Sequence, residues 1–556
     1  MAPSARRGRR RQARGRGAAV PSSGSRGQGA TRWTRWIAYA LLALFAVVMG
    51  VPALTEHRIG NYAVETDFYW KYGPAARGLL QGRVDIEHYD SKGWGYPAAV
   101  ALVSAPGLDP FRAAQILALL SALAAGWLLY RIHRSLLGPS LALLSLLLVL
   151  SNRTFLANTY EVGTDMFFFA VVLGSLALLF RSGAPGGWAI LVSGLLGGWA
   201  FSTRYNGLFL WPGAIALFLL VRPAGGGARG GLRRSLVWTL GFFGAALPWL
   251  IINAVHTGHP LTNSNYVNVG FAVYGEGNWE KFFYGSDRNI RSFADVVLLD
   301  PARFGRVMLG NVVEHLRRDL SELMPLLWGA LGVLGAILLV RDRPGRRTAA
   351  YALVWALYFL TLVPIFYGTR FSLPLLAGYA CLACWPFVSA TLGKPIESLE
   401  RSFPLRSFVF LALWIPTAVS AYQWVQDPRN PESLRAGPYE LKPAIGFLRD
   451  HGAGEALLAR KPHAAFIAGM RFVPIPQVDS PAALHEAGEK AGARYLLVSG
   501  AELALRAAIR PFASGGVAIP GFALAFESPG ALVYELHPYE PGAQAPVAAT
   551  PGAQVP

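Results

Sequence analysis

Long apolar runs recur along this chain and constrain its fold more than any other feature. They extend from Trp36 to Trp424 and approach the roughly 20 residues that a helix needs to cross a bilayer. Of the 556 residues, 53% are hydrophobic and only 15% are charged. Because a segment in lipid must satisfy its own backbone hydrogen bonds, these runs predict a polytopic α-helical membrane protein.

We predict about eleven membrane-spanning helices. Their approximate ranges are 35–54, 111–130, 136–151, 164–180, 187–202, 208–221, 235–255, 323–340, 348–366, 371–392 and 407–424. Alternate turns, at 131–134, 181, 222–234, 341–347 and 394–406, all contain basic residues, as the positive-inside rule requires of cytoplasmic turns. The N-terminus is therefore expected in the cytoplasm of a multi-pass inner (plasma) membrane protein.

The segments outside the spans have distinct compositions. Ten arginines and no acid occur in the first 36 residues, so residues 1–33 are expected to form a disordered, basic cytoplasmic tail. The net charge of +19 thus indicates contact with anionic lipid, and no nucleic-acid partner is expected. After the transmembrane domain, 34–425, short strand-like and helical runs alternate, which predicts a small extracytoplasmic α/β domain over 426–540. The Pro- and Ala-rich end, 541–556, is expected to be disordered.

Two long outer loops are expected, at 55–97 and 256–322. The second is too long for a plain loop. Its run 301–320 places arginines among apolar residues, which is typical of helices that lie on a membrane surface.

Carboxylates and aromatic residues gather in the first outer loop, just after the first span. Glu65 and Asp67 are two positions apart, so an extended backbone would point them to one side, whereas a helix would separate them by about 200°. Paired beside lipid, they could accept a proton from a hydroxyl or hold a divalent cation. The alternative is that both are solvated loop acids.

A second acidic segment opens the fourth span on the same expected face. It contains Glu161 and Asp165, and ionisable groups at the mouth of a span are costly unless they are paired or used. Thr164 and Asp165 could equally cap the helix.

Three arginines violate the charge rule because they lie in short outer turns: Arg153, Arg204 and Arg370. A guanidinium group suits phosphate oxygens, so these residues indicate an anionic ligand such as the phosphate of a lipid carrier. Alternatively, each arginine contacts lipid headgroups or pairs with a local acid.

Over roughly residues 35–425 the chain resembles the GT-C superfamily of membrane glycosyltransferases. The likeness is to bacterial relatives of protein O-mannosyltransferases and of the aminoarabinose transferase that modifies lipid A. Asp67-Phe68-Tyr69 followed by 75–82 is similar to the family's catalytic loop, which implies that Asp67 is catalytic. Tyr96-Pro97 resembles the motif that closes this loop. Phe68 stands where many members carry a second acid, and Glu65 is the candidate to replace it.

Two further positions match the family's pattern. Asp165 lies where members carry another acid, and 370–374 resembles an Arg-Tyr-x-x-Pro element, which implies that Arg370 contacts the phosphate of a lipid-linked donor. The residues that we predict for the site are Asp67, Glu65 and Asp165 for catalysis, Arg370, Arg204 and Tyr205 for the donor phosphate, and Tyr69, Lys71, Tyr96 and Glu161 for other substrate contacts. A divalent cation, Mg²⁺ or Mn²⁺, would be held by Glu65, Asp67 and Asp165.

The predicted function is transfer of a hexosyl or pentosyl group from a polyprenyl-phosphate sugar to an extracytoplasmic hydroxyl of a lipid, glycan or protein, with inversion. The alternative from another class is a lipid or glycan transporter or flippase without chemistry. Two others are a recognition protein that acts through its C-terminal domain, and a polysaccharide polymerase or ligase that uses the loop 256–322.

Overall fold

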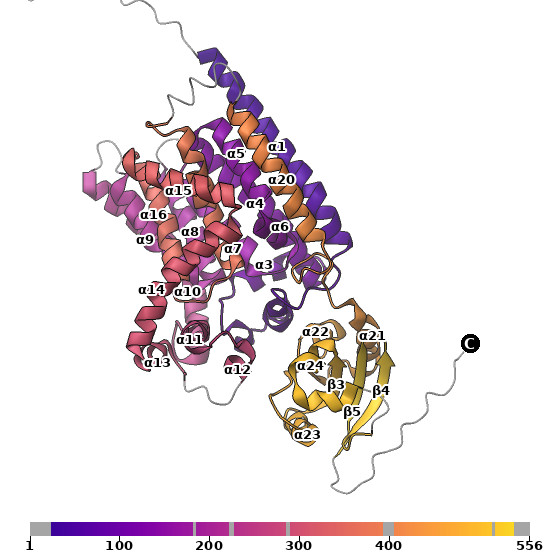
Figure 1. Ribbon diagram of the computed structural model, residues 1–556. Coiled ribbons are helices and arrows are strands. Elements are labelled where there is room, and N and C mark those ends of the chain that lie inside the picture. Colours follow the sequence, from indigo (N-terminus) through magenta and orange to yellow (C-terminus); the bar gives the residue numbers. More distant parts are fainter. Residues whose placement is uncertain are drawn as a thin grey trace, which may run out of the picture.

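The computed structural model describes residues 24–181, 185–221, 227–284, 290–392, 405–513 and 518–538. A helical bundle carries a five-stranded sheet domain at one end (Figure 1). The expected tail 541–556 lies outside the described residues, as does most of the tail 1–33. The part of that tail from Gly24 onward belongs to the first helix.

Each expected span coincides with a helix. These helices are α1 (Gly24–Thr55), α4 (Pro110–Leu137), α5 (Pro139–Leu150), α7 (Thr164–Leu179), α8 (Gly187–Thr203), α9 (Leu210–Leu220), α10 (Gly227–Thr257), α15 (Leu326–Arg341), α16 (Arg346–Leu362), α18 (Leu376–Cys384) and α20 (Leu405–Gln426). Among the described residues, α1, α4 and α10 are long and apolar enough to cross a membrane alone. Helix α5 and the following α6 (Arg153–Tyr160), bent by 64°, would make a fourth span. The helical membrane-type fold is confirmed, and the count of eleven spans stays a prediction.

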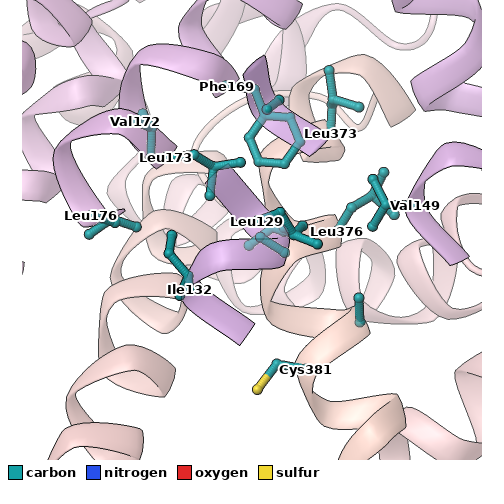
Figure 2. Close-up of a cluster of buried hydrophobic side chains, with 14 of the residues drawn as sticks. Leu129, Ile132, Val149, Phe169, Val172, Leu173, Leu176, Leu373, Leu376 and Cys381 are labelled. Atoms are coloured by element: carbon teal, nitrogen blue, oxygen red, sulfur yellow. The ribbon is translucent and has the colours of Figure 1, made fainter. Parts of the chain in front are cut away.

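The bundle's core lies where α4, α5, α7 and the segment 373–384 meet (Figure 2). Leu129, Phe169 and Leu373 are fully buried there, and Cys381 is 5% exposed. Helices α8 and α10 pack especially closely: a Cβ on Gly194 would lie 2.2 Å from Trp238 O, and one on Gly198 would lie 2.1 Å from Phe242 O. Small residues at this spacing let two backbones approach, and this packing fixes the end of α8.

Two groups of short helices project from the end of the bundle that also carries the sheet domain (Figure 1), which we call the loop end. The first group is η1 (Phe68–Tyr72), α2 (Gly73–Leu80), η2 (Ile86–Tyr89) and α3 (Gly95–Ser104). The second is α11 (Tyr266–Tyr274), α12 (Trp279–Tyr284), α13 (Phe293–Leu298), α14 (Pro301–Arg318) and η4 (Asp319–Leu323). Helix α14 leaves Leu309 and Val313 about three-quarters and two-thirds exposed, an apolar strip that fits the amphipathic helix expected there.

The C-terminal domain has a mixed sheet in the order β2-β1-β3-β5-β4. Its strands are β1 (Ala456–Ala459), β2 (Arg471–Pro474), β3 (Ala493–Ser499), β4 (Phe522–Ser528) and β5 (Ala531–Leu536), and its helices are α21 (Lys442–Gly452), α22 (His463–Ala468), α23 (Pro481–Lys490) and α24 (Gly500–Leu505). β1 pairs in parallel with β2 and β3, whereas β5 is antiparallel to β3 and β4. Leu457 and Leu458 are both buried but belong to different apolar clusters, because helices cover both faces of the sheet. The α/β character expected from the sequence is confirmed.

The C-terminal domain contacts both loops of the loop end. Lys461 Nζ donates to Tyr62 O at 2.7 Å, and Arg77 Nη1 donates to Phe466 O at 3.1 Å. On the other side, Glu280 of α12 forms ion pairs with Arg460 and, at 2.8 Å, with Arg506. The first loop is thus packed between the helical bundle and the C-terminal domain.

Candidate functional site

Asp67 lies at the loop end, immediately before η1. Its backbone is helical (φ −62°, ψ −30°). Two positions apart on a helix, Glu65 and Asp67 therefore diverge, and the extended arrangement that would pair them is absent here. Asp67 keeps 38% of its side chain exposed, so it is accessible to a ligand.

Glu65 is fully buried and its carboxylate is occupied. It accepts hydrogen bonds from the backbone N–H of Asn61 at 2.7 Å and of Val162 at 2.8 Å, and it lies 2.8 Å from His57 Nε2. These contacts tie the first loop to the turn before α7. Glu65 thus holds the loop's backbone in place, and it does not stand beside Asp67 as a second exposed acid.

Cations surround Asp67. Lys92 Nζ lies 3.6 Å from Asp67 Oδ2. Burial alone would raise the pKa of Asp67, but Lys92, Arg370 and Lys71 outweigh it and hold the pKa below its usual value. The carboxylate is therefore ionised at neutral pH and can accept a proton or a hydrogen bond.

Lys92 is a candidate site residue that the sequence analysis missed. It donates a hydrogen bond to Tyr72 Oη, and burial together with Arg204 and Arg370 lowers its pKa to about 8, although Asp67 opposes this. The glycines beside it explain its position: a Cβ on Gly93 would lie 2.4 Å from Ser202 O, so the loop is pressed against the end of α8. In the sequence, the signal that could have indicated Lys92 was a lysine followed by a glycine in the loop that contains Asp67.

Asp165 and Arg204 form a buried ion pair at the loop end of α7 and α8. Their side chains are 6% and 7% exposed, and Arg204 Nη1 also donates to Thr164 Oγ1 at 3.1 Å. Gly163, not a hydroxyl or carboxylate, occupies the N-cap of α7, so neither Thr164 nor Asp165 acts as the cap there. Arg204 is therefore paired with Asp165, and the charges of both residues act on Lys92.

Arg370 opens the short helix α17 (Thr369–Ser372). It has neither a hydrogen bond nor an ion pair to any residue that the structure describes, and its guanidinium lies 4.9 Å from the ring of Phe371. Burial lowers its pKa, but Asp165 and Asp67 outweigh that effect, so the net shift is upward. A charged guanidinium without a direct partner, near Asp67 and Lys92, is suited to an external anion.

The remaining predicted residues have structural contacts. Tyr69 is 2% exposed, accepts from Gly60 N at 2.8 Å and stacks on Phe111; Tyr96 is 1% exposed. Tyr205 accepts a hydrogen bond from Trp249 Nε1 at 3.1 Å. The other two are polar: Lys71 pairs with Asp90, and Glu161 accepts from Asn61 Nδ2 at 3.0 Å, with its pKa raised by burial and by Glu65. Among the described contacts, none of these five residues forms an ion pair with Asp67, whereas Lys92 does.

The three carboxylates considered for a divalent cation do not fit one. Glu65 faces His57 and backbone N–H groups, Asp165 faces Arg204, and Asp67 faces Lys92. Within the described ranges no group of three or more His, Cys, Asp or Glu side chains converges as metal ligands would. A cation-rich surrounding such as that of Asp67 repels Mg²⁺ or Mn²⁺.

Removal of divalent cations is therefore expected to leave turnover unchanged. Assays after treatment with EDTA, and after addition of Mg²⁺ or Mn²⁺, should agree within about twofold, because the positive charges come from side chains. A loss of activity on chelation that Mg²⁺ or Mn²⁺ restores would contradict this interpretation of the carboxylates.

The helical bundle thus carries a charged cluster at the loop end, and an α/β domain packs over it. The family model described as dolichyl-phosphate-mannose-protein mannosyltransferase matches residues 97–252, from α3 into α10. The resemblance to GT-C proteins that the sequence motifs indicate is confirmed. Comparison with curated protein sequences gives no match.

Two solved structures share the fold over nearly the whole chain. ArnT from Cupriavidus metallidurans bound to undecaprenyl phosphate matches with a TM-score of 0.54 and 14% identity, covering 90% of this chain and 98% of that one. The oligosaccharyltransferase from Archaeoglobus fulgidus in its apo form matches with a TM-score of 0.55 and 12% identity, covering 92% of this chain and 75% of that one. At these identities the likeness is one of fold.

Proposed function

We propose that this chain is a membrane glycosyltransferase that moves a sugar from a polyprenyl-phosphate donor to a hydroxyl of an acceptor lipid, glycan or protein. The observation that carries the proposal is the position of Arg370. This partly buried cation forms neither a hydrogen bond nor an ion pair in the described parts of the chain, and it lies with Lys92 near the accessible carboxylate of Asp67. Two cations are suited to the oxygens of a phosphate, and an accessible carboxylate is suited to the hydroxyl of an acceptor. The matched family description and the undecaprenyl phosphate bound to ArnT support this donor class.

In the proposed reaction the acceptor oxygen attacks the anomeric carbon as the bond from that carbon to the phosphate oxygen breaks. Polyprenyl phosphate leaves, the anomeric configuration inverts, and Asp67 takes the hydroxyl proton. Lys92 and Arg370 stabilise the charge that grows on the leaving phosphate. Once phosphate engages these cations, they depress the pKa of Asp67 less, so donor binding makes Asp67 a better base.

The topology follows from the same proposal. The loop end faces the outer side of the plasma membrane, where the acceptor is found, and the basic turns face the cytoplasm. An apolar pocket of about 350 Å³ between α16 and α18, lined by Tyr351, Trp355 and Leu375 among others, is suited to part of a polyprenyl chain.

The pH dependence of donor use is expected to follow Lys92. Because its pKa is about 8 in the free protein, raising the pH through 8 removes a positive charge from the phosphate site, and kcat/KM for the donor should fall there. Lys92→Arg should move this alkaline limb to higher pH, since arginine stays charged. A limb at pH 8 that persists in Lys92→Arg would assign it to another group.

The test of the function is release of polyprenyl phosphate from a panel of polyprenyl-phosphate sugars, with purified protein in nanodiscs and a range of acceptors. Turnover of one donor that depends on an acceptor hydroxyl is the expected result and names the sugar. Movement of intact donor between leaflets without release of polyprenyl phosphate would instead assign the chain as a flippase.

A further inference from the structure

A cavity with charged lining lies at the end of the bundle opposite to the loop end. It has a volume of about 550 Å³ and lies between the N-terminal part of α1, the last turns of α4 and the end of α7. Four arginines contribute to its lining: Arg35, Arg131, Arg134 and Arg181. The proposed transfer reaction uses none of them.

The lining residues share two helix faces. Trp127, Arg131 and Arg134 are spaced four and three apart on α4, so they lie on one side of that helix. Arg35 and Tyr39 are four apart on α1 and share a face in the same way. The rings of Tyr39 and Trp127 stack at 4.7 Å, which joins the two faces.

Neighbouring contacts hold the third wall in place. Ser135 Oγ donates to Phe180 O at 2.8 Å, which ties α4 to the end of α7. Arg347 of α16 donates to Arg181 O at 2.6 Å. The backbone that carries Arg181 is therefore fixed beside the arginines of α4, as a binding site requires.

Among the described residues, no acidic side chain balances the positive charges of the cavity. No Asp or Glu belongs to the described lining, and none of the four arginines forms an ion pair within the part of the chain that the structure describes. Four cations around one space repel one another, and an anion bound there relieves that repulsion. Arginine is also the side chain whose geometry best matches phosphate oxygens.

We propose that this cavity binds the phosphate group of an anionic phospholipid. Trp33 and Trp36, 71% and 58% exposed on α1, are placed as residues of an interfacial aromatic belt, which puts Arg35 at headgroup depth. Basic pockets between membrane helices on the cytoplasmic side are typical sites for such headgroups. The volume is in the range of ligand pockets.

The experiment measures lipid binding by the delipidated full-length protein in detergent, with native mass spectrometry. The probes are phosphatidylglycerol, cardiolipin, phosphatidylcholine and inorganic phosphate. We expect the two anionic lipids to bind about tenfold more tightly than phosphatidylcholine, and Arg131→Gln/Arg134→Gln to abolish that preference. Arg35→Gln, on the exposed side of α1, is a second variant that tests the site if the double variant does not fold.

The matched control is Arg233→Gln/Arg234→Gln, which removes two charges from α10 at the same end but outside the cavity. It should keep the lipid preference. An equal loss in both double variants, or no preference of the native protein for anionic lipid, would overturn the proposal. Binding of inorganic phosphate that needs Arg131 and Arg134, without lipid binding, would overturn the lipid as the source and assign the site to a soluble phosphate.

Discussion

Replacing Asp67 by Asn is expected to reduce release of polyprenyl phosphate at least about a hundredfold, the scale of a lost general base. The amide keeps the size of the side chain but cannot take the proton of the attacking hydroxyl. Asp67 also raises the pKa of Lys92, so the variant should be assayed well below pH 8, where Lys92 stays protonated without it. The measurement is single-turnover release of polyprenyl phosphate with saturating donor.

The control for this variant is Glu87→Gln in the same loop. Glu87 is 81% exposed and its only ion contact is a 4.0 Å approach to His88, among residues the structure describes, so its loss should change the rate less than twofold. Unchanged turnover by Asp67→Asn would place the base elsewhere while leaving the fold assignment intact. Equal losses in both variants would point to a general effect of loop charge.

The helices and the fold class could be predicted from the sequence because hydropathy and the spacing of apolar residues are local properties. Each expected span coincides with a helix, and short β-type patterns such as 495–498 coincide with strands, although none indicated β2. Whether a short helix such as α9 or α18 crosses a membrane alone is not a local property. It depends on what the helix packs against.

The site divides in the same way. Asp67 and Arg370 could be proposed from motifs that resemble those of GT-C proteins, and Arg370 also because an arginine in a short outer turn breaks the charge rule. Glu65 was assigned beside Asp67, but that depended on backbone conformation, and the helical turn sends its carboxylate to His57. The sequence does not distinguish the roles of Arg204 and Arg370, because only the fold shows that Arg204 forms an ion pair with Asp165.

Lys92 shows most clearly what sequence alone lacks. Gly93, next to Lys92, packs against the end of α8, which lies more than a hundred positions further along the chain. Lys461 of the C-terminal domain contacts the first loop across an even larger separation in sequence. Lys461 donates to Tyr62 O at 2.7 Å and approaches Thr66 Oγ1 at 3.4 Å, next to Asp67. Such contacts between distant segments leave no periodic pattern in the sequence.

Replacing Arg370 by Ala is expected to lower kcat/KM for the donor about a hundredfold, as removal of a donor to a developing anion does. Arg370 forms neither a hydrogen bond nor an ion pair with a described side chain, so its truncation breaks no direct pair. Its removal also lets the pKa of Asp67 rise, which makes Asp67 a stronger base, so a fall in kcat/KM reports the lost contact to the donor. Arg370→Lys should recover part of the loss, because the charge returns without the two-pronged geometry. Donor titrations at a fixed acceptor concentration measure both effects.

Arg153→Ala is the matched control, since Arg153 is another arginine that the sequence placed in an outer turn. Arg153 is exposed, its guanidinium lies 4.9 Å from the ring of Trp424, and it has no role in the proposed reaction. Its removal should leave kcat/KM within about twofold, as for surface side chains generally. If Arg370→Ala and Arg153→Ala behaved alike, the donor phosphate would not be held by Arg370. Lys92 and Arg204 would then be the cations to test. If Lys92→Gln also left kcat/KM for the donor unchanged, the phosphate site would lie away from Asp67.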